Sequence, residues 1–178
     1  MELFATRPVD EVTVQDIASA VEMSPAAVYY HFASKDQILT VGMRQFAERL
    51  VDEVRGHLPE PGDRQGIAAL LTHLVAWTGQ NRPEATVYFV NSIGLNLMVE
   101  ALRRETRVEL IELLREAARA VRPGVGRAEA GVIAVALVSL LETSLASMLN
   151  QDAVHRRAGT KRFVIEVAAI GDRIAGIA

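Results

Sequence analysis

The chain has no cysteine among its 178 residues, which excludes disulfide bonds, thiolate catalysis and thiolate metal sites. No basic segment followed by an apolar run opens the sequence, so we expect a cytoplasmic protein rather than a secreted one. The four histidines lack a paired H-x-x-x-H spacing, and neither a Walker loop nor a G-x-G-x-x-G motif occurs. We therefore expect no catalytic residue, no metal site and no cofactor, and a protein that is not an enzyme.

Charge is moderate, and half of the residues are apolar, which is enough for a packed core. The formal net charge of −3 gives no whole-chain sign of nucleic-acid binding, so local features must decide that point. Residues 130–149 are apolar over most of their length, but Glu142 lies among them, and a carboxylate inside a bilayer is costly. We expect a core or interface helix there, not a membrane span.

Signals for β-strands are scarce, because the sequence has no Asn-Gly or Asp-Gly turn and no long apolar–polar alternation. Helical periodicity is strong instead. In residues 35–57 the apolar positions that recur every three or four residues are Leu39, Met43, Phe46, Leu50 and Val54. Further helices are expected at 63–80, 83–97, 98–121, 127–150 and 160–177. The predicted fold class is all-α.

Residues 13–31 predict two short helices joined by the turn "EMS". Thr13 followed by Asp16 is close to a capping box, with aspartate in place of glutamate. Ser24 can cap the second helix, which starts with Pro25, and Ser34 can cap the long helix that follows. Two short helices with a tight turn form a helix-turn-helix, whose second helix enters the major groove of DNA.

The stretch "LFATRPVDEVTVQDIASAVEMSPAAVYYHFASKDQIL" resembles the DNA-binding domain of the TetR family of bacterial transcriptional repressors. The matching features are "LF" at 3–4, "VTV.DIA" at 12–18, serine at 24, "YYHF" at 29–32 and "SK" at 34–35. Beyond residue 45 the chain matches the family only in the number and order of its helices. The resemblance implies a helix-turn-helix DNA-binding domain over 1–45, its first helix truncated, and a helical effector-binding and dimerisation domain over 46–178.

The resemblance also implies which residues meet DNA. The expected set is Thr13, Ser24, Pro25, Ala26, Tyr29, Tyr30, His31 and Lys35. Most of these would contact phosphates, which positions the protein without reading sequence. Pro25 and Ala26 would face the bases, where they can touch thymine methyl groups but cannot form bidentate hydrogen bonds. Specificity would then depend on dimer spacing and DNA shape. The alternative is that the tyrosines pack against the long helix.

The N-terminus departs from the family pattern in two ways. Residues 1–5 supply only the last turn of the expected first helix, and Pro8 stands where the family usually has a glycine. Proline cannot adopt the left-handed conformation of such a glycine, so we expect a different turn. Residues 1–58 hold five Lys or Arg against nine acids, a poor balance for phosphate binding. We expect the natural protein to start upstream, with added positive charge; the alternative is a true short start with weakened DNA affinity.

By the same resemblance, the helices between about 62 and 121 form an effector-binding region. The candidate ligand residues are His73, Trp77, Tyr88, Phe89, Asn91, Asn96 and Met98. An apolar pocket with a few polar groups is typical of small-molecule sites. The alternative is that the aromatics are ordinary core and the asparagines bind neighbouring backbone. No charged residue separates Glu84 from Glu100 in this segment, which favours a neutral or lipophilic effector.

The helix at 127–150 carries more apolar surface than one neighbouring helix can cover. The resemblance implies that it and the last helix pair with a second subunit in a four-helix bundle. The candidate interface residues are Val135, Val138, Leu141, Leu145, Phe163, Val167, Ile170, Gly171 and Ile174. We expect Glu142 at the bundle edge or paired with an arginine.

The sequence as a whole predicts a homodimeric, ligand-responsive transcriptional regulator. We expect a repressor that binds a palindromic operator in double-stranded DNA and is released when a small-molecule effector moves the helix at 35–57. The alternative is a helical dimeric sensor or carrier of small molecules that no longer binds DNA.

Overall fold

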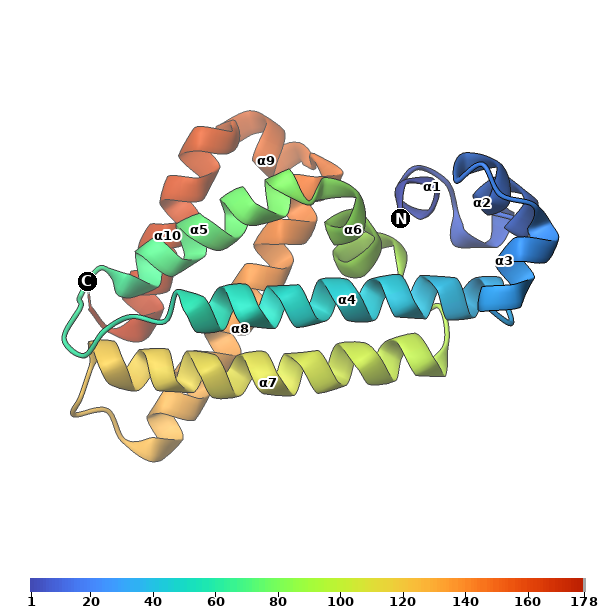
Figure 1. The fold of residues 1–178 in the computed structure, drawn as a ribbon. Coiled ribbons are helices and arrows are strands. Elements are labelled where there is room, and N and C mark those ends of the chain that lie inside the picture. Colours follow the sequence, from blue (N-terminus) through green and yellow to red (C-terminus); the bar gives the residue numbers. More distant parts are fainter. Residues whose placement is uncertain (178) are drawn as a thin grey trace.

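The computed structural model describes residues 1–177, and among them it contains helices and no β-strand, as predicted (Figure 1). The elements in chain order are α1 (Glu2–Thr6), η1 (Val9–Glu11), α2 (Val14–Ala20), α3 (Pro25–His31), α4 (Lys35–Gly56), α5 (Gly66–Gln80), α6 (Arg82–Thr86), η2 (Val87–Asn91), α7 (Leu97–Val121), α8 (Arg127–Asn150), α9 (Ala153–Ala158) and α10 (Thr160–Ala175).

The long helices α4 and α7 lie side by side (Figure 1). α8 crosses behind them, and α5 packs against α10 on the other side of α4 (Figure 1). The apolar stripe predicted along α4 faces this core, because Leu39, Met43, Phe46 and Leu50 are fully buried. α4 continues unbroken through residue 45, so the small head formed by α1–α3 and the larger helical body share one helix.

The helix expected at 83–97 is broken in the structure. α6 ends at Thr86, η2 follows as one turn of π-helix, and a turn leads into α7. Two residues of that turn explain the break. Gly94 adopts a φ of +77°, and the Asn96 side chain accepts the backbone N–H of Val99 at 2.9 Å, which starts a new helix.

α9 was not predicted from the sequence, because it is short and lies in a polar segment. Asp152 caps this helix, since its Oδ1 accepts the backbone N–H groups of Val154 and His155, both at 2.9 Å. α10 follows after Gly159, whose φ of +74° reverses the chain between the two helices.

α8 is the helix in the described chain that is long and apolar enough to cross a membrane by length and hydropathy alone, and half of its most apolar window is buried in the protein. Glu142 on this helix forms an ion pair with Arg107 of α7, which is one of the two arrangements expected from the sequence. Another guanidinium nitrogen of Arg107 donates to Ser139 Oγ at 3.0 Å. These contacts, with the packing of α7 on α8, support a core role for the helix.

The N-terminal turn is attached to the body. Asn91 of η2 donates through Nδ2 to the carbonyl oxygens of Phe4 and Ala5, at 2.9 and 3.3 Å, and the Phe4 ring is buried. After α1 the chain leaves through Arg7 in an extended conformation and Pro8 at φ −51°. The predicted departure from a left-handed glycine turn is therefore confirmed.

Candidate nucleic-acid interface

α2 begins with the capping box that the sequence predicted. Thr13 Oγ1 accepts the Asp16 backbone N–H at 3.1 Å, and Asp16 Oδ2 accepts the Thr13 backbone N–H at 2.9 Å and its hydroxyl at 2.8 Å. These contacts satisfy N–H groups that have no partner within the helix. Thr13 is thus engaged in forming the start of α2.

The turn between α2 and α3 is tight. Glu22 adopts a left-handed φ of +55°, and the Met23 N–H donates to the Ala18 carbonyl at 2.9 Å. Ser24 Oγ then accepts the Ala27 N–H at 3.1 Å, with Pro25 at the first helical position. The caps and the turn fix the orientation of α3 relative to α2, as a helix-turn-helix requires.

The outward face of α3 carries large aromatic side chains with little protein contact. Tyr30 is 86% exposed and Tyr29 is 56% exposed, so neither is packed against α4 as a core residue would be. The rings of Tyr30 and His31 meet edge to face, with centroids 5.1 Å apart. Pro25 is half-buried and Ala26 is exposed at the start of the helix. The structure therefore brings these predicted residues together on one exposed helix.

Lys35 occupies a different place from the one predicted. Its Nζ donates to the Val9 carbonyl oxygen at 2.6 Å and is 3.3 Å from the Asp10 carbonyl oxygen, both in η1. The ammonium therefore ties η1 to the start of α4 instead of projecting freely toward a phosphate. We interpret Lys35 as a brace of the head.

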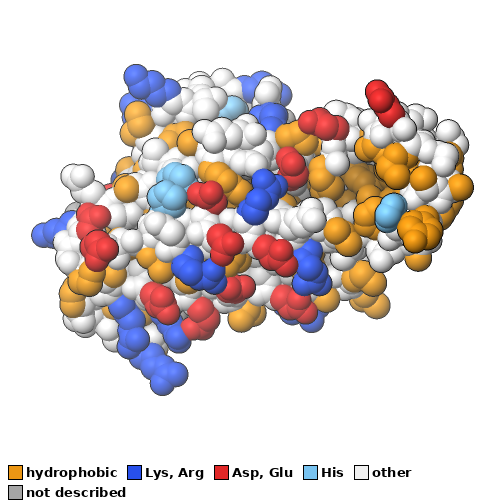
Figure 2. Space-filling model, viewed as in Figure 1, with side chains coloured by type: hydrophobic (Ala, Val, Ile, Leu, Met, Phe, Trp, Pro, Cys, Tyr) orange, Lys and Arg blue, Asp and Glu red, His pale blue; other side chains and the backbone are white. Residues whose placement is uncertain are grey.

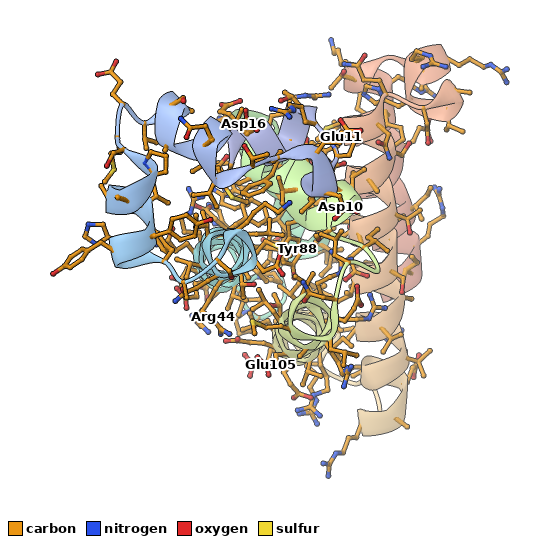
Figure 3. The ribbon with its side chains drawn as sticks, turned by 90° about the vertical axis from the view of Figure 1, so that its right-hand side faces the viewer. Asp10, Glu11, Asp16, Arg44, Tyr88 and Glu105 are labelled. Carbon is orange, nitrogen blue, oxygen red and sulfur yellow. The ribbon has the colours of Figure 1, made fainter. Side chains whose placement is uncertain are left out.

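The second basic residue near the head is also paired. Arg7 lies 3.3 Å from the Asp16 carboxylate and donates to the Glu11 carbonyl oxygen at 2.6 Å. Asp10, Glu11 and Asp16 lie along the same N-terminal segment (Figure 3). On the face that Figure 2 shows, Lys and Arg side chains lie over the body, interspersed with acidic ones, and the head end shows apolar, histidine and acidic side chains. Free positive charge is scarce at the head.

Replacing Lys35 with methionine should lower the stability of the subunit, because it leaves the η1 carbonyls without their charged donor. We expect a loss of about 1–2 kcal/mol and a fall in Tm of about 3–6 °C, measured by thermal unfolding. Arg104→Met, which also replaces an exposed cationic side chain with methionine but on α7, is the matched control and should change Tm by less than about 1 °C. An unchanged Tm in Lys35→Met would show that the brace contributes nothing.

The capping contacts make the head sensitive to acid. Hydrogen bonds from the Thr13 backbone and hydroxyl, with Arg7 nearby, hold the pKa of Asp16 below its ordinary value. A lowered folded-state pKa stabilises the fold above the unfolded pKa of about 3.9, and this stabilisation is lost as pH falls through the folded pKa. The free energy of unfolding, measured in urea, should be higher for wild type than for Asp16→Asn near pH 6, and this difference should shrink toward pH 3. A difference independent of pH would contradict this.

The seven predicted effector residues do not line one pocket. The rings of Trp77 and Tyr88 lie with centroids 5.3 Å from that of Phe46, and the Phe89 centroid is 6.0 Å away, so these aromatics form core. The remaining four have separate roles: Asn91 holds α1, Asn96 caps α7, Met98 is exposed, and His73 binds Glu53 at 2.6 Å.

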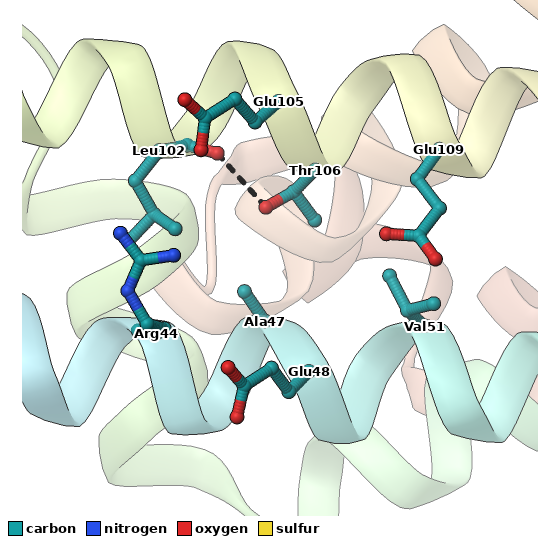
Figure 4. Close-up of a pocket in the computed structure, with 8 residues that line it drawn as sticks. All are labelled: Arg44, Ala47, Glu48, Val51, Leu102, Glu105, Thr106 and Glu109. Carbon is teal, nitrogen blue, oxygen red and sulfur yellow. Dashed lines mark hydrogen bonds between the residues drawn. The ribbon is translucent and has the colours of Figure 1, made fainter.

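A groove that was not predicted from the sequence lies between α4 and α7, with a volume of about 210 Å³ (Figure 4). Its charged lining residues are Arg44, Glu48, Glu105 and Glu109, with Thr106 on the same wall as the last two. Carboxylates outnumber the single guanidinium, so this groove differs from the apolar pocket that the sequence suggested. No sequence signal could find it, because the two helices are far apart in the chain and their pairing depends on the tertiary fold.

Most of the predicted interface residues are buried within the subunit itself. α7 packs on α8 and α5 packs on α10, and Gly171 lies against Leu71 without room for a Cβ atom. These contacts make the following residues unavailable to a partner: Val138, Leu141, Leu145, Phe163, Val167 and Gly171. Val135 is 45% exposed, and Ile170 and Ile174 are half-buried. Val132 of α8 and Ile165 of α10 are also exposed apolar residues.

Known proteins resemble this chain in the sequence of its head and in its fold. Residues 1–41 match the model of the family described as bacterial regulatory proteins, tetR family. No curated protein matches the chain. AmtR from Mycobacterium smegmatis has a similar structure, with a TM-score of 0.67 and 24% sequence identity over 98% of this chain and 81% of that one.

Two further solved structures have the same fold. The TetR-family transcriptional regulator PfmR from Thermus thermophilus gives a TM-score of 0.68 at 24% identity, over 98% of this chain and 93% of that one. The fatty acid degradation regulator FadR from Bacillus halodurans gives 0.72 at 14% identity, over 97% and 91%. Residues 1–41 therefore carry the N-terminal domain of the tetR family of bacterial regulatory proteins, and the chain as a whole has the fold of TetR-family regulators.

Proposed function

We propose that this protein is a cytoplasmic, homodimeric transcriptional regulator that represses by binding a palindromic operator and is released by a small-molecule effector. The observation that carries the proposal is the exposed face of α3. Tyr29, Tyr30 and His31 project from a helix whose start is capped by Ser24 and whose sequence falls within the family match. The second helix of a helix-turn-helix lies in the major groove of DNA, so exposed side chains on α3 are placed to contact DNA.

The contacts to DNA would be mostly uncharged. Hydroxyl groups of Tyr29 and Tyr30 can donate to phosphate oxygens, and so can those first-turn N–H groups of α2 and α3 that the caps Thr13 and Ser24 do not hold. Pro25 and Ala26 would approach the bases. Because Arg7 and Lys35 are held within the head, few counterions would be released, and affinity should depend only weakly on salt for a DNA-binding protein.

Dimerisation would place two heads on one duplex. Val132 and Val135 of α8 and Ile165 of α10 are 70%, 45% and 53% exposed, so both of these adjacent helices carry aliphatic side chains that the single subunit leaves uncovered. An isologous bundle of α8 and α10 from two subunits would cover it. A two-fold symmetric dimer then requires two half-sites about one helical turn apart.

Release by an effector would act through α4. This helix begins at Lys35 in the head and ends at Gly56 in the body, so a displacement of its body end also moves the head. Asn91 adds a second link, because it joins η2 of the body to α1. An effector that binds one conformation of the subunit better than another, the two differing in where α4 lies, favours that conformation. The distance between the two heads of the dimer then changes, and with it the affinity for DNA.

Selection from a library of random DNA duplexes tests the proposal. We expect the wild-type protein to enrich an inverted repeat with half-sites spaced by about 10 base pairs. Failure to enrich any sequence, at both low and physiological salt, would contradict DNA recognition. The helical sensor or carrier of small molecules would then stand as the function.

A further inference from the structure

Three side chains that the proposed function leaves unused meet at the end of α4 farthest from the head. Glu53 lies on the last turns of α4, His57 caps its end one turn later, and His73 faces them from α5. His73 Nε2 lies 2.6 Å from Glu53 Oε2, and His57 Nδ1 lies 3.8 Å from the same oxygen. One ligand atom from each residue lies within 4.8 Å of the other two.

We propose that Glu53, His57 and His73 form a binding site for a late first-row divalent cation such as Zn²⁺. Two imidazole nitrogens and one carboxylate oxygen are a ligand set that such ions take from proteins, with water completing the shell. Mg²⁺ and Ca²⁺ prefer sets made of oxygen alone, so the two imidazoles select against them. The chain has no cysteine, so no thiolate elsewhere competes for the ion.

The spacing of the donors is close to what an ion requires. A tetrahedral Zn²⁺ with bonds of about 2.1 Å holds its ligand atoms about 3.4 Å apart. The observed separations from the Glu53 oxygen, 2.6 and 3.8 Å, lie on either side of this value. Both separations from the Glu53 oxygen are therefore within about 1 Å of the value that an ion requires.

One ring must turn for the ion to bind. The His57 and His73 rings stack with centroids 3.5 Å apart and planes 19° from parallel, and an ion cannot lie in both planes at once. His57 can turn, because its side chain is 45% exposed at the open end of α4. The turn gives up the contact between His57 Nδ1 and the Glu53 carbonyl oxygen, which is 2.9 Å long.

The cluster is open to solvent and lies where α4 and α5 meet. All three side chains are partly exposed, so solvent can deliver the ion and supply the remaining ligands. Glu53 and His57 belong to α4 and its end, and His73 belongs to α5, so a bound ion would join these two helices. The ion would thereby restrain the body end of α4.

Calorimetric titration of ZnCl₂ into tag-free protein, without DNA, tests the site. We expect one ion per chain and at least a tenfold loss of affinity in each of Glu53→Gln, His57→Ala and His73→Ala. Glu11→Gln, which removes an exposed carboxylate in the head, is the matched control and should bind as wild type does. Saturating Zn²⁺ should raise the Tm of wild type by at least about 3 °C, and the same Zn²⁺ concentration should raise the Tm of His57→Ala by less.

The absence of binding to the wild type would overturn the proposal, and so would equal binding by the His57→Ala and His73→Ala variants. His57 is exposed at a helix end, so its variant keeps the fold even where His73→Ala destabilises it, and circular dichroism verifies this. No DNA enters the measurement, so its outcome is separate from that of the operator selection.

Discussion

Replacing Val135 with aspartate should convert the proposed dimer to monomers while the subunit stays folded. Val135 is 45% exposed in the single subunit, so the new carboxylate can stay hydrated there. In the proposed bundle each copy would be buried without a partner, which costs about 3–5 kcal/mol. The dissociation constant should therefore rise by a factor of at least about 100, measured by sedimentation equilibrium.

Val108→Asp is the matched control for this variant. Val108 lies on α7 and is 57% exposed, so the substitution introduces the same charge on a helix outside the proposed bundle. It should sediment as the wild-type dimer. If Val135→Asp remains dimeric, or if both variants dissociate alike, the interface lies elsewhere.

Replacing Phe46 with alanine should cause the largest loss of stability among single substitutions on α4. Phe46 is fully buried, and its ring lies against those of Trp77, Tyr88 and Phe89. Removing it leaves a cavity at the point where α4 meets α5 and η2. The expected cost is about 3–5 kcal/mol, which corresponds to a fall in Tm of about 10–15 °C by calorimetry.

Gln45→Ala is the control for the helix itself, because Gln45 is the exposed neighbour of Phe46 on α4. It should change the free energy of unfolding by less than about 0.5 kcal/mol. A loss below about 1 kcal/mol in Phe46→Ala would show that the aromatic cluster is not packed as described.

Local features of the fold could be predicted from the sequence because they depend on neighbouring residues. Thr13, Ser24 and Ser34 each cap the helix that they were expected to cap, with hydrogen bonds of 3.1 to 3.2 Å. The four-residue and three-residue spacing along α4 identified its buried face. The places where helices end were harder to predict. Asn96 caps α7, but the apolar run before it gave no sign of the turn. Asp152 caps α9, which is only six residues long.

Which candidate residues are exposed could be predicted where one element carries them, but not where several elements meet. The exposed face of α3 could be predicted from the residues of that helix alone. The hydrogen bonds of Lys35 depend on where η1 lies, which the sequence of α4 does not indicate. The apolar residues of α8 and α10 likewise do not indicate which neighbouring helix covers each face. Leu141 and Val138 are as apolar as Val135, yet α7 and other helices of the same subunit bury them.

The histidine cluster was missed for the same reason. A paired H-x-x-x-H motif places two ligands on one helix, whereas His57 and His73 come from successive elements. Glu53 and His57 do stand four residues apart, and this spacing was the available signal. The approach of α5 to the end of α4 is what completes the site.

The central claim is that the exposed face of α3 binds DNA, and one comparison tests it most directly. The affinity of wild type and of the Tyr29→Ala/Tyr30→Ala double variant is measured by fluorescence anisotropy on the selected duplex at several salt concentrations. We expect the double variant to bind at least about tenfold more weakly, with an unchanged salt dependence because no charge is lost. Its Tm should change little because Tyr29 and Tyr30 are 56% and 86% exposed. Equal affinity of the two proteins would contradict the claim.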